Sequence, residues 1–315
     1  MKKKKNRGLS MTTQFPEIQS FVEWMVNQKG RSCHTVTAYL GAIRQFIDFL
    51  GHYHGTKPDL GQLQAATLTD VRAFLSMRAL QSIKAQSSAV VVSALKTYYR
   101  FLRSKGVNVP VVMHTLRSPR IPRKMPRPLS IEQVNSIISM APQSECWIDW
   151  RDHSLTALLY ATGLRIHEAL SLNMAHWALR DRLYVVGKGG KERMIPLLKR
   201  AFHAVEKYRQ ICPYSTINPD DPLFFGKRGR RLQASIYQKY FRSVRCQMNL
   251  PSHATPHSLR HSFASHLLDH NASLRDVQEM MGHASLRSTQ RYTASSQKHL
   301  QEIYRAFHPD GDSSD

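Results

Sequence analysis

The chain has 315 residues, of which 42% are hydrophobic, so it is long and apolar enough to form two ordinary domains. Its 45 lysines and arginines outnumber its 22 aspartates and glutamates, and the formal net charge is +23 at pH 7. This charge is typical of proteins that bind phosphates, and nucleic acid is the first partner to consider. A run of about 18 apolar residues is missing, and no apolar core follows the opening lysines, so we expect a cytoplasmic protein without membrane insertion.

The first half of the chain has a helical pattern. Apolar residues recur at spacings of three and four, as in Tyr39, Ile43, Phe46 and Leu50, and this is the period of an amphipathic helix. Glycines at positions 30, 51 and 106 predict helix ends. We therefore expect an all-helical domain over residues 14–109, after a basic segment, 1–13, that we expect to be disordered.

Residues 110–129 combine prolines with basic residues, which disfavours regular structure and predicts a domain linker. Two interpretations of its positive charge stay open. The segment is either a solvated linker or a strand of chain that lies along a phosphate backbone.

Residues 130–308 form the second predicted domain. The helical pattern resumes at residue 130 and is interrupted by two alternating runs, Arg182–Val186 and Glu192–Pro196, with glycines between them. This pattern predicts a β-hairpin or small sheet. From residue 198 we expect helices again as far as residue 307, followed by an acidic, disordered tail over 309–315.

Arg165 follows an apolar helix and a break at Gly163, an unusual place for a guanidinium unless it binds an acid or a phosphate. Glu168 lies one helical turn later, so an Arg165–Glu168 ion pair is the alternative. Lys188 stands between glycines at the expected hairpin tip, where simple solvent exposure is the alternative.

His257 and Arg260 are three residues apart and share a face of the helix that they begin. His283 follows Gly282, a natural helix stop. For both histidines, a capping or surface role is the alternative. Tyr292 lies between polar neighbours with no apolar stripe to bury it.

Together, these side chains suggest a phosphate site built of cationic donors and one nucleophilic phenol. Two arginines can each donate forked hydrogen bonds to non-bridging oxygens and neutralise a pentacoordinate transition state. The sequence shows no nearby carboxylate cluster for magnesium, and its four cysteines lack CxxC spacing, so we expect neither a metal nor a cofactor. A metal-binding alternative rests on five histidines that point around several helix faces: His253, His257, His261, His266 and His270.

Four segments resemble the signature motifs of the tyrosine recombinases, also called the phage integrase family: ATGLRIHEAL, GKGGKERMIPL, HSLRHSFASHLL and MMGHASLRSTQRYT. The helical segment TVTAYLGAIRQFIDFL is similar to the core-type DNA-binding domain of the Xer recombinases, so the resemblance covers nearly the whole chain. It implies a mainly α fold with a small β-sheet. An all-helical N-terminal core-binding domain and an α+β catalytic domain would form a C-shaped clamp around DNA.

The resemblance also implies a set of catalytic residues, in chain order Arg165, Lys188, His257, Arg260, His283 and Tyr292. Tyr292 would attack a scissile phosphate and form a 3′-phosphotyrosyl bond, with His257 assisting the loss of the phenol proton. Lys188 would protonate the departing oxygen, and Glu168 would orient an arginine or histidine from behind. His167 and Lys191 depart from the commonest pattern, and Lys191 is a second candidate for the acid.

The implied activity is site-specific recombination of double-stranded DNA at an inverted-repeat core site by a homo- or hetero-tetramer, with a paralogous recombinase as one possible partner. The chain leaves little room for an arm-binding domain, which favours a Xer-type enzyme that resolves chromosome or plasmid dimers at cell division. A septal DNA translocase is then a further expected partner, and the protein would be associated with the nucleoid. Two alternatives stay open: a minimal integrase or transposase of a phage or mobile element, and a catalytically silent DNA-binding protein.

Overall fold

The computed structural model describes residues 16–57, 60–107, 109, 116–119, 127–177, 179, 182–186, 192–214, 218–270 and 272–282. The chain divides into two compact units, Met1–Lys124 and Met125–Asp315, and each is described by itself. Within the described residues, no helix is long and apolar enough to cross a membrane.

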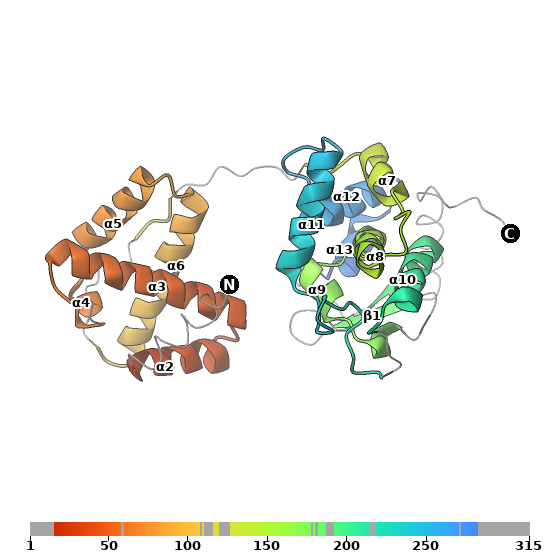
Figure 1. Cartoon of the computed structure of the whole chain (residues 1–315). Coiled ribbons are helices and arrows are strands. Elements are labelled where there is room, and N and C mark those ends of the chain that lie inside the picture. The colour runs from red at the N-terminus through yellow and green to blue at the C-terminus, as the bar shows by residue number, and fades with distance from the viewer. Residues whose placement is uncertain are drawn as a thin grey trace. The chain divides into compact units, whose positions relative to one another are not determined.

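The N-terminal unit is helical, as the spacing of its apolar residues predicts (Figure 1). Its elements are α2 (Pro16–Glu23), a π-helical turn (Trp24–Gln28), α3 (Cys33–His54), α4 (Leu60–Ala65), α5 (Leu68–Leu80) and α6 (Ala85–Ser104). The long helices α3 and α6 pack against each other. Their apolar stripes meet α2 and α5 in one core that includes Phe21, Phe46, Phe74 and Tyr98.

The end of α3 differs from our prediction, which placed it at Gly51. The helix continues to His54, and the chain leaves it at Gly55, whose φ of +67° lies in the left-handed region. A glycine inside a helix is destabilising by only about 1 kcal/mol. The left-handed position at Gly55 therefore decides where the helix ends, and the N–H of Gly55 donates to the carbonyl of Gly51.

The C-terminal unit is built around one buried helix, α8 (Trp147–Thr162), in which every residue from Arg151 to Thr162 is buried. Figure 1 shows α8 end-on among its neighbours. Helices α7 (Ile131–Ser139), α10 (Lys199–Ile211) and α12 (Pro256–Asp269) pack against it. The remaining elements are α9 (Ile166–Ser171), a 3-10 turn (Met174–Trp177), α11 (Ala234–Gln247) and α13 (Leu274–Met280).

The predicted hairpin is confirmed with its bounds, since β1 (Arg182–Val186) pairs antiparallel with β2 (Glu192–Pro196). Leu183 lies opposite Ile195, and Val185 lies opposite Arg193. Side chains alternate between the two faces of a strand, so these four residues share one face. The three apolar members are buried in the core, and the mainly α fold with a small sheet is therefore confirmed.

The prediction of continuous helices from residue 198 is wrong between α10 and α11. There the described residues form loops and two isolated bridges, Asn173 with Pro222 and Phe225 with Arg231. Prolines and glycines in NPDDPLFFGKRG break the helical pattern, although Leu223 and its two phenylalanine neighbours are buried. The segment is apolar enough to join the core without being a helix. The part of the prediction beyond residue 282 lies outside the described residues.

Candidate active site

Arg165 lies in the short connection between α8 and α9, where it is the N-cap residue of α9. Its backbone N–H donates to Oε2 of Glu168 over 3.0 Å, and its Nη1 lies 2.8 Å from Oε1 of the same carboxylate. The ion pair that the spacing allowed is therefore present. The guanidinium nevertheless stays 43% exposed, so Glu168 orients Arg165 without covering it.

Gly163 ends α8 with a φ of +60°, and this turn brings two parts of the site together. A Cβ at this position would lie 2.4 Å from the ring of Phe263 in α12, so close that the ring would have to move. The carbonyl of Gly163 accepts a hydrogen bond from Arg260 in the same helix. The glycine thus allows α8 and α12 to approach closely, with Arg165 following two residues later.

Arg260 is almost fully buried, with its side chain only 3% exposed. Its Nη1 donates to the carbonyl of Gly163 and its Nη2 to the carbonyl of Met281. Burial and the neighbouring positive charge of Arg165 lower the pKa of Arg260 to about 10, with Arg193 acting in the same direction and Glu168 opposing it. The group is still protonated at neutral pH, so the site keeps a desolvated positive charge.

Glu168 is the centre of an arginine cluster, which we define as Arg165, Glu168, Arg193 and Arg260. Its Oε2 lies 2.8 Å from Nη2 of Arg193 and 3.8 Å from Nη1 of Arg260. Burial works to raise the pKa of Glu168, but hydrogen bonds from the Arg165 backbone and from Arg193 together hold it below its ordinary value. The carboxylate is therefore ionised, and three guanidinium groups share one negative charge.

Arg193 was missed by the sequence analysis, although a signal for it exists. The alternation of β2 places Arg193 on the same face as the buried Ile195, where an arginine must find a partner. Its Nη2 binds Glu168, and its Nε donates to the carbonyl of Met280 over 2.9 Å. The hairpin is thereby joined to α9 and to the end of α13.

His257 is the second residue of α12, directly after Pro256, and the helix is capped by Thr255 and Ser258. Its ring is exposed, and its Nε2 lies 3.1 Å from Nε2 of His261, one turn along the helix. Partial burial, followed by the charges of Arg260 and Arg165, lowers its pKa below the ordinary 6.5. At neutral pH the imidazole is therefore uncharged and able to accept a proton.

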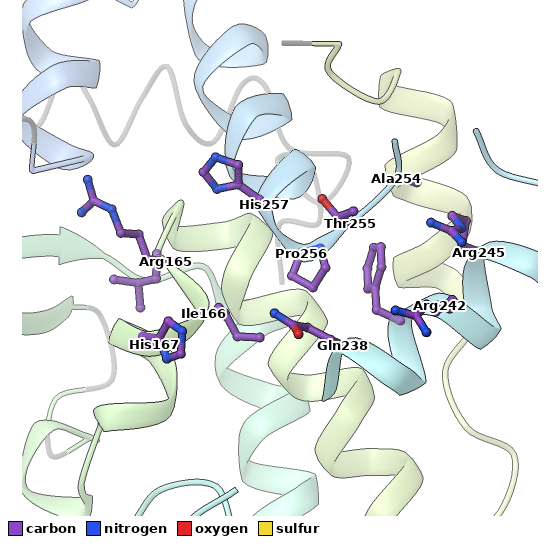
Figure 2. A pocket seen from close by; sticks show the side chains of 12 residues that line it. Arg165, Ile166, His167, Gln238, Arg242, Arg245, Ala254, Thr255, Pro256 and His257 are labelled. Atoms are coloured by element: carbon purple, nitrogen blue, oxygen red, sulfur yellow. The ribbon is translucent and has the colours of Figure 1, made fainter. Parts of the chain in front are cut away.

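A pocket of about 450 Å³ lies beside Arg165 and His257. Figure 2 shows these two side chains on one side of the pocket, with Arg242 and Arg245 of α11 on the other. His167, which departs from the commonest pattern of the family that this chain resembles, also lines it. The pocket thus carries positive charge on two of its walls, an arrangement that suits an anionic ligand.

The structure brings together three of the catalytic residues expected from the sequence, Arg165, His257 and Arg260, and it places Glu168 behind them. The other three, Lys188, His283 and Tyr292, lie outside the described residues, as does Lys191. Gly282, the last described residue, directly precedes His283. Within the described parts of the chain, no three metal-ligating side chains come together.

Comparison with known proteins places both units in one family. The model of the phage integrase family matches residues 127–299, more than half of the chain. A second model, the N-terminal SAM-like domain of phage integrases, matches residues 18–106. The matched ranges include all six residues that the resemblance implied to be catalytic.

Among individual relatives, the chain is 36% identical over 296 residues to the tyrosine recombinase XerC of Rickettsia peacockii (strain Rustic), covering 93% of this chain and 96% of that protein. XerC of Rickettsia prowazekii (strain Madrid E) is 34% identical over the same coverage.

Two examples illustrate the solved structures that share the fold. One is the XerH site-specific recombinase bound to a palindromic difH substrate, with a TM-score of 0.65 at 18% identity, covering 98% of this chain and 86% of that one. The other is a lambda integrase tetramer bound to a Holliday junction, with a TM-score of 0.63 at 19% identity, covering 88% of this chain and 78% of that one. The chain therefore belongs to the phage integrase family and is a tyrosine site-specific recombinase.

Proposed function

We propose that this chain cuts and rejoins double-stranded DNA through a 3′-phosphotyrosyl intermediate with Tyr292 as the nucleophile. The observation that carries the proposal is the arginine cluster. Its three guanidinium groups and one carboxylate leave a net charge of +2, and its exposed member, Arg165, borders a pocket with further arginines. An excess of fixed, partly desolvated positive charge is what a phosphoryl transition state requires.

In this proposal Arg165 and Arg260 bind the non-bridging oxygens of the scissile phosphate. His257, uncharged at neutral pH, accepts the proton of the attacking phenol, whose ordinary pKa is about 10. Lys188 protonates the departing 5′ oxygen, and His283 donates a hydrogen bond to a non-bridging oxygen.

The chemistry is an exchange of phosphodiester bonds. The Tyr292 oxygen forms a bond to phosphorus while the bond to the 5′ oxygen breaks, and the freed 5′-hydroxyl then attacks the phosphotyrosyl bond of a partner strand. One phosphoester forms for each that breaks, so no external energy source is needed. No metal or cofactor is part of the proposed mechanism.

For the assembly, we propose four protomers, all alike or mixed with a paralogous recombinase, on two duplexes that carry inverted-repeat core sites. Support comes from the net charge of +23 and from the fold shared with a lambda integrase tetramer on a Holliday junction. The helical domain, 14–109, and the catalytic domain, 130–308, would close around the duplex as a clamp joined by the linker 110–129. The ends, 1–13 and 309–315, would lie outside both domains.

For the biological role, we propose resolution of chromosome or plasmid dimers at cell division, in the cytoplasm at the nucleoid and with a septal DNA translocase as activator. The support is the similarity to XerC proteins over 93% of the chain. A mobile-element integrase would share the chemistry but use a different DNA site. Finding the inverted-repeat sequence to which the protein binds most tightly, and whether it lies in the chromosome or in a mobile element, separates the two roles.

The central experiment uses a nicked suicide DNA substrate that traps the covalent intermediate. We expect the wild-type protein to form an adduct and Tyr292→Phe to lose it while keeping its affinity for DNA. An undiminished adduct in Tyr292→Phe would overturn the choice of nucleophile. If the wild-type protein forms no adduct on any bound site, the catalytically silent alternative is correct.

Two further measurements address the cationic residues. Cleavage should persist in excess EDTA, because arginine, lysine and histidine side chains supply the positive charge. Lys188→Ala should cleave normal DNA poorly but recover when the bridging 5′ oxygen is replaced by sulfur, a leaving group that needs no proton. If cleavage of the sulfur-containing substrate recovers in Lys191→Ala but not in Lys188→Ala, Lys191 is the general acid instead.

A further inference from the structure

Arg193 is an arginine with no role in the proposed chemistry, yet it binds Glu168, the carboxylate at the centre of the arginine cluster. Its side chain is 11% exposed and lies on the inward face of β2, opposite Val185. It donates through Nη2 to Oε2 of Glu168 and through Nε to the carbonyl of Met280. Burying a guanidinium is energetically costly. Stabilising a two-stranded hairpin would not by itself account for placing Arg193 here.

The two oxygens of Glu168 are divided unequally among the arginines. Oε1 accepts from the side chain of Arg165 over 2.8 Å. Oε2 accepts from the backbone of Arg165 and from Arg193 over 3.0 and 2.8 Å, whereas Arg260 lies 3.8 Å from the same oxygen, beyond hydrogen-bond distance. Arg193 therefore holds the position on Oε2 that Arg260 would otherwise take.

This arrangement matters because Arg260 is proposed to bind the scissile phosphate. A direct hydrogen bond to Glu168 would offset its charge and turn some of its donors away from the DNA. At present Arg260 binds only backbone carbonyls, of Gly163 and Met281, within the described residues apart from the longer contact with Glu168.

We propose that Arg193 is a positioning residue that keeps Glu168 turned toward Arg165 and away from Arg260, so that Arg260 keeps its charge and its donors for the phosphate. The inference rests on the proposed function of this site. Arg193 acts through Glu168 and does not itself touch the DNA.

The second hydrogen bond of Arg193 holds the backbone shortly before His283 and Tyr292, two further residues of the proposed mechanism. Arg193 holds the carbonyl of Met280 and Arg260 holds the next one, that of Met281. The following residue is Gly282, with a φ of +63°, where a Cβ would lie 3.0 Å from Nη1 of Arg193. Arg193 thus fixes both Glu168 and the last described turn before His283.

Lysine cannot replace this arginine. The two bonds of Arg193 leave from Nε and Nη2, which point in fixed and different directions on a planar fork. A lysine ammonium at this position keeps the charge but reaches Glu168 or Met280 with a single atom. Arg193→Lys is therefore the informative variant, because it preserves charge and most of the buried stem.

The test measures single-turnover cleavage of the suicide substrate at a temperature at which every variant is folded, with folding checked by thermal unfolding. We expect Arg193→Lys and Arg193→Met to cleave about 100-fold more slowly, the effect expected when reacting groups are misplaced by about 1 Å. Their affinity for DNA should stay within about twofold of wild type, because Arg193 is not a DNA contact. Cleavage at the wild-type rate by folded Arg193→Met would overturn the inference.

A double-mutant cycle separates positioning from a purely structural role. If Arg193 acts through Glu168, the double variant Arg193→Met, Glu168→Gln should cleave no more slowly than the slower of its two single variants, because the carboxylate that draws Arg260 away is no longer charged. Multiplication of the two single losses would mean that Arg193 acts independently of Glu168.

Arg231 provides a matched control. It is an arginine of the same unit that, like Arg193, donates to backbone carbonyls, those of Leu170 and Leu172, but it is exposed and has no contact with Glu168 among the described interactions. Arg231→Lys should lower the unfolding temperature while its folded form cleaves normally. An equal loss of cleavage in folded Arg231→Lys and folded Arg193→Lys would show that Arg193 has no specific role in positioning Glu168.

The wild-type protein in the same assay tests the proposed function separately from the positioning role of Arg193. If the wild type forms no covalent adduct, the proposed function fails. If the wild type forms the adduct and the folded Arg193 variants cleave at the wild-type rate, the proposed function stands and the positioning role is wrong.

Discussion

Two arginine–carboxylate clusters among the described residues of the C-terminal unit differ in stoichiometry and exposure. In the first, Nε and Nη2 of Arg151 each donate over 2.8 Å to an oxygen of Asp152, and both side chains are nearly inaccessible, at 2% and 6% exposed. In the arginine cluster, one carboxylate, Glu168, serves three guanidinium groups, of which Arg165 is 43% exposed.

The two clusters separate a structural role of a buried arginine from a role in binding an anion. The pair of Arg151 and Asp152 is neutral and closed, and its remaining bond goes to the carbonyl of Phe225, so it connects α8 to the loop before α11. The arginine cluster has an excess of positive charge and opens onto a pocket. Neutral, enclosed pairs are typical of structure, whereas a positive, accessible cluster is typical of an anion site.

The largest effect that we expect comes from removing the carboxylate of the neutral pair of Arg151 and Asp152. Asp152→Ala leaves Arg151 buried with an unbalanced charge, and the free energy of unfolding should fall by about 3–5 kcal/mol. Urea unfolding measures it. The double variant Arg151→Met, Asp152→Leu removes both charges and should regain most of the loss. An Asp152→Ala protein as stable as wild type would contradict a structural role for this pair.

The next effect concerns Arg260, where we expect activity to fall rather than stability. Arg260→Lys keeps the charge but cannot hold the carbonyls of Gly163 and Met281 and also present forked donors, so single-turnover cleavage should fall by about 10²–10³-fold. The matched variant in the closed pair is Arg151→Lys, whose folded fraction should cleave at the wild-type rate. Equal losses of cleavage in both variants would erase the distinction between the two clusters.

A smaller effect is expected at Gly163, which connects α8 to the arginine cluster. Gly163→Ala introduces a Cβ 2.4 Å from the Phe263 ring, and this overpacking should lower the free energy of unfolding by about 1–3 kcal/mol. Thermal or urea unfolding checks it. Adding Phe263→Leu provides room and should restore part of the stability, whereas a further loss in the double variant would show that the left-handed φ alone is responsible.

The smallest effect is a difference in pH dependence. The pKa of Glu168 is held below its ordinary 4.5, so its ionised form stabilises the fold above that pH, and the contribution is lost as the pH falls below it. Burial raises the pKa of Asp152 above 3.8 despite the bonds from Arg151, so its contribution has the opposite sign and is lost as the pH rises. Unfolding free energies at pH 4 and pH 7 measure both.

The two variants Glu168→Gln and Asp152→Asn should therefore respond to pH in opposite directions. The stability advantage of wild type over Glu168→Gln should be larger at pH 7 than at pH 4, and its advantage over Asp152→Asn should be smaller at pH 7. Parallel slopes for the two variants would contradict the contrast between the clusters.

Much of the architecture follows from local patterns in the sequence. The period of the apolar residues predicts the helices, and the alternating runs on either side of glycines predict both strands of the hairpin with their bounds. Two predictions were wrong: that α3 ends at Gly51, and that helices continue between α10 and α11. A glycine such as Gly51 can lie inside a helix or at its end, and buried apolar residues such as those near 224 can belong to a helix or to a loop. Packing chooses between such alternatives.

For the site, the sequence by itself supplied the candidate side chains, through their order along the chain and through the resemblance of four segments to the signature motifs of the tyrosine recombinases. It also determined the Arg165–Glu168 pair, which lies within one helical turn. Only the tertiary structure decided that Arg193, from the hairpin, and Arg260, from α12, converge on the same carboxylate. These residues are far apart along the chain, and their meeting depends on the close approach of α8 and α12 at Gly163, which no local pattern encodes.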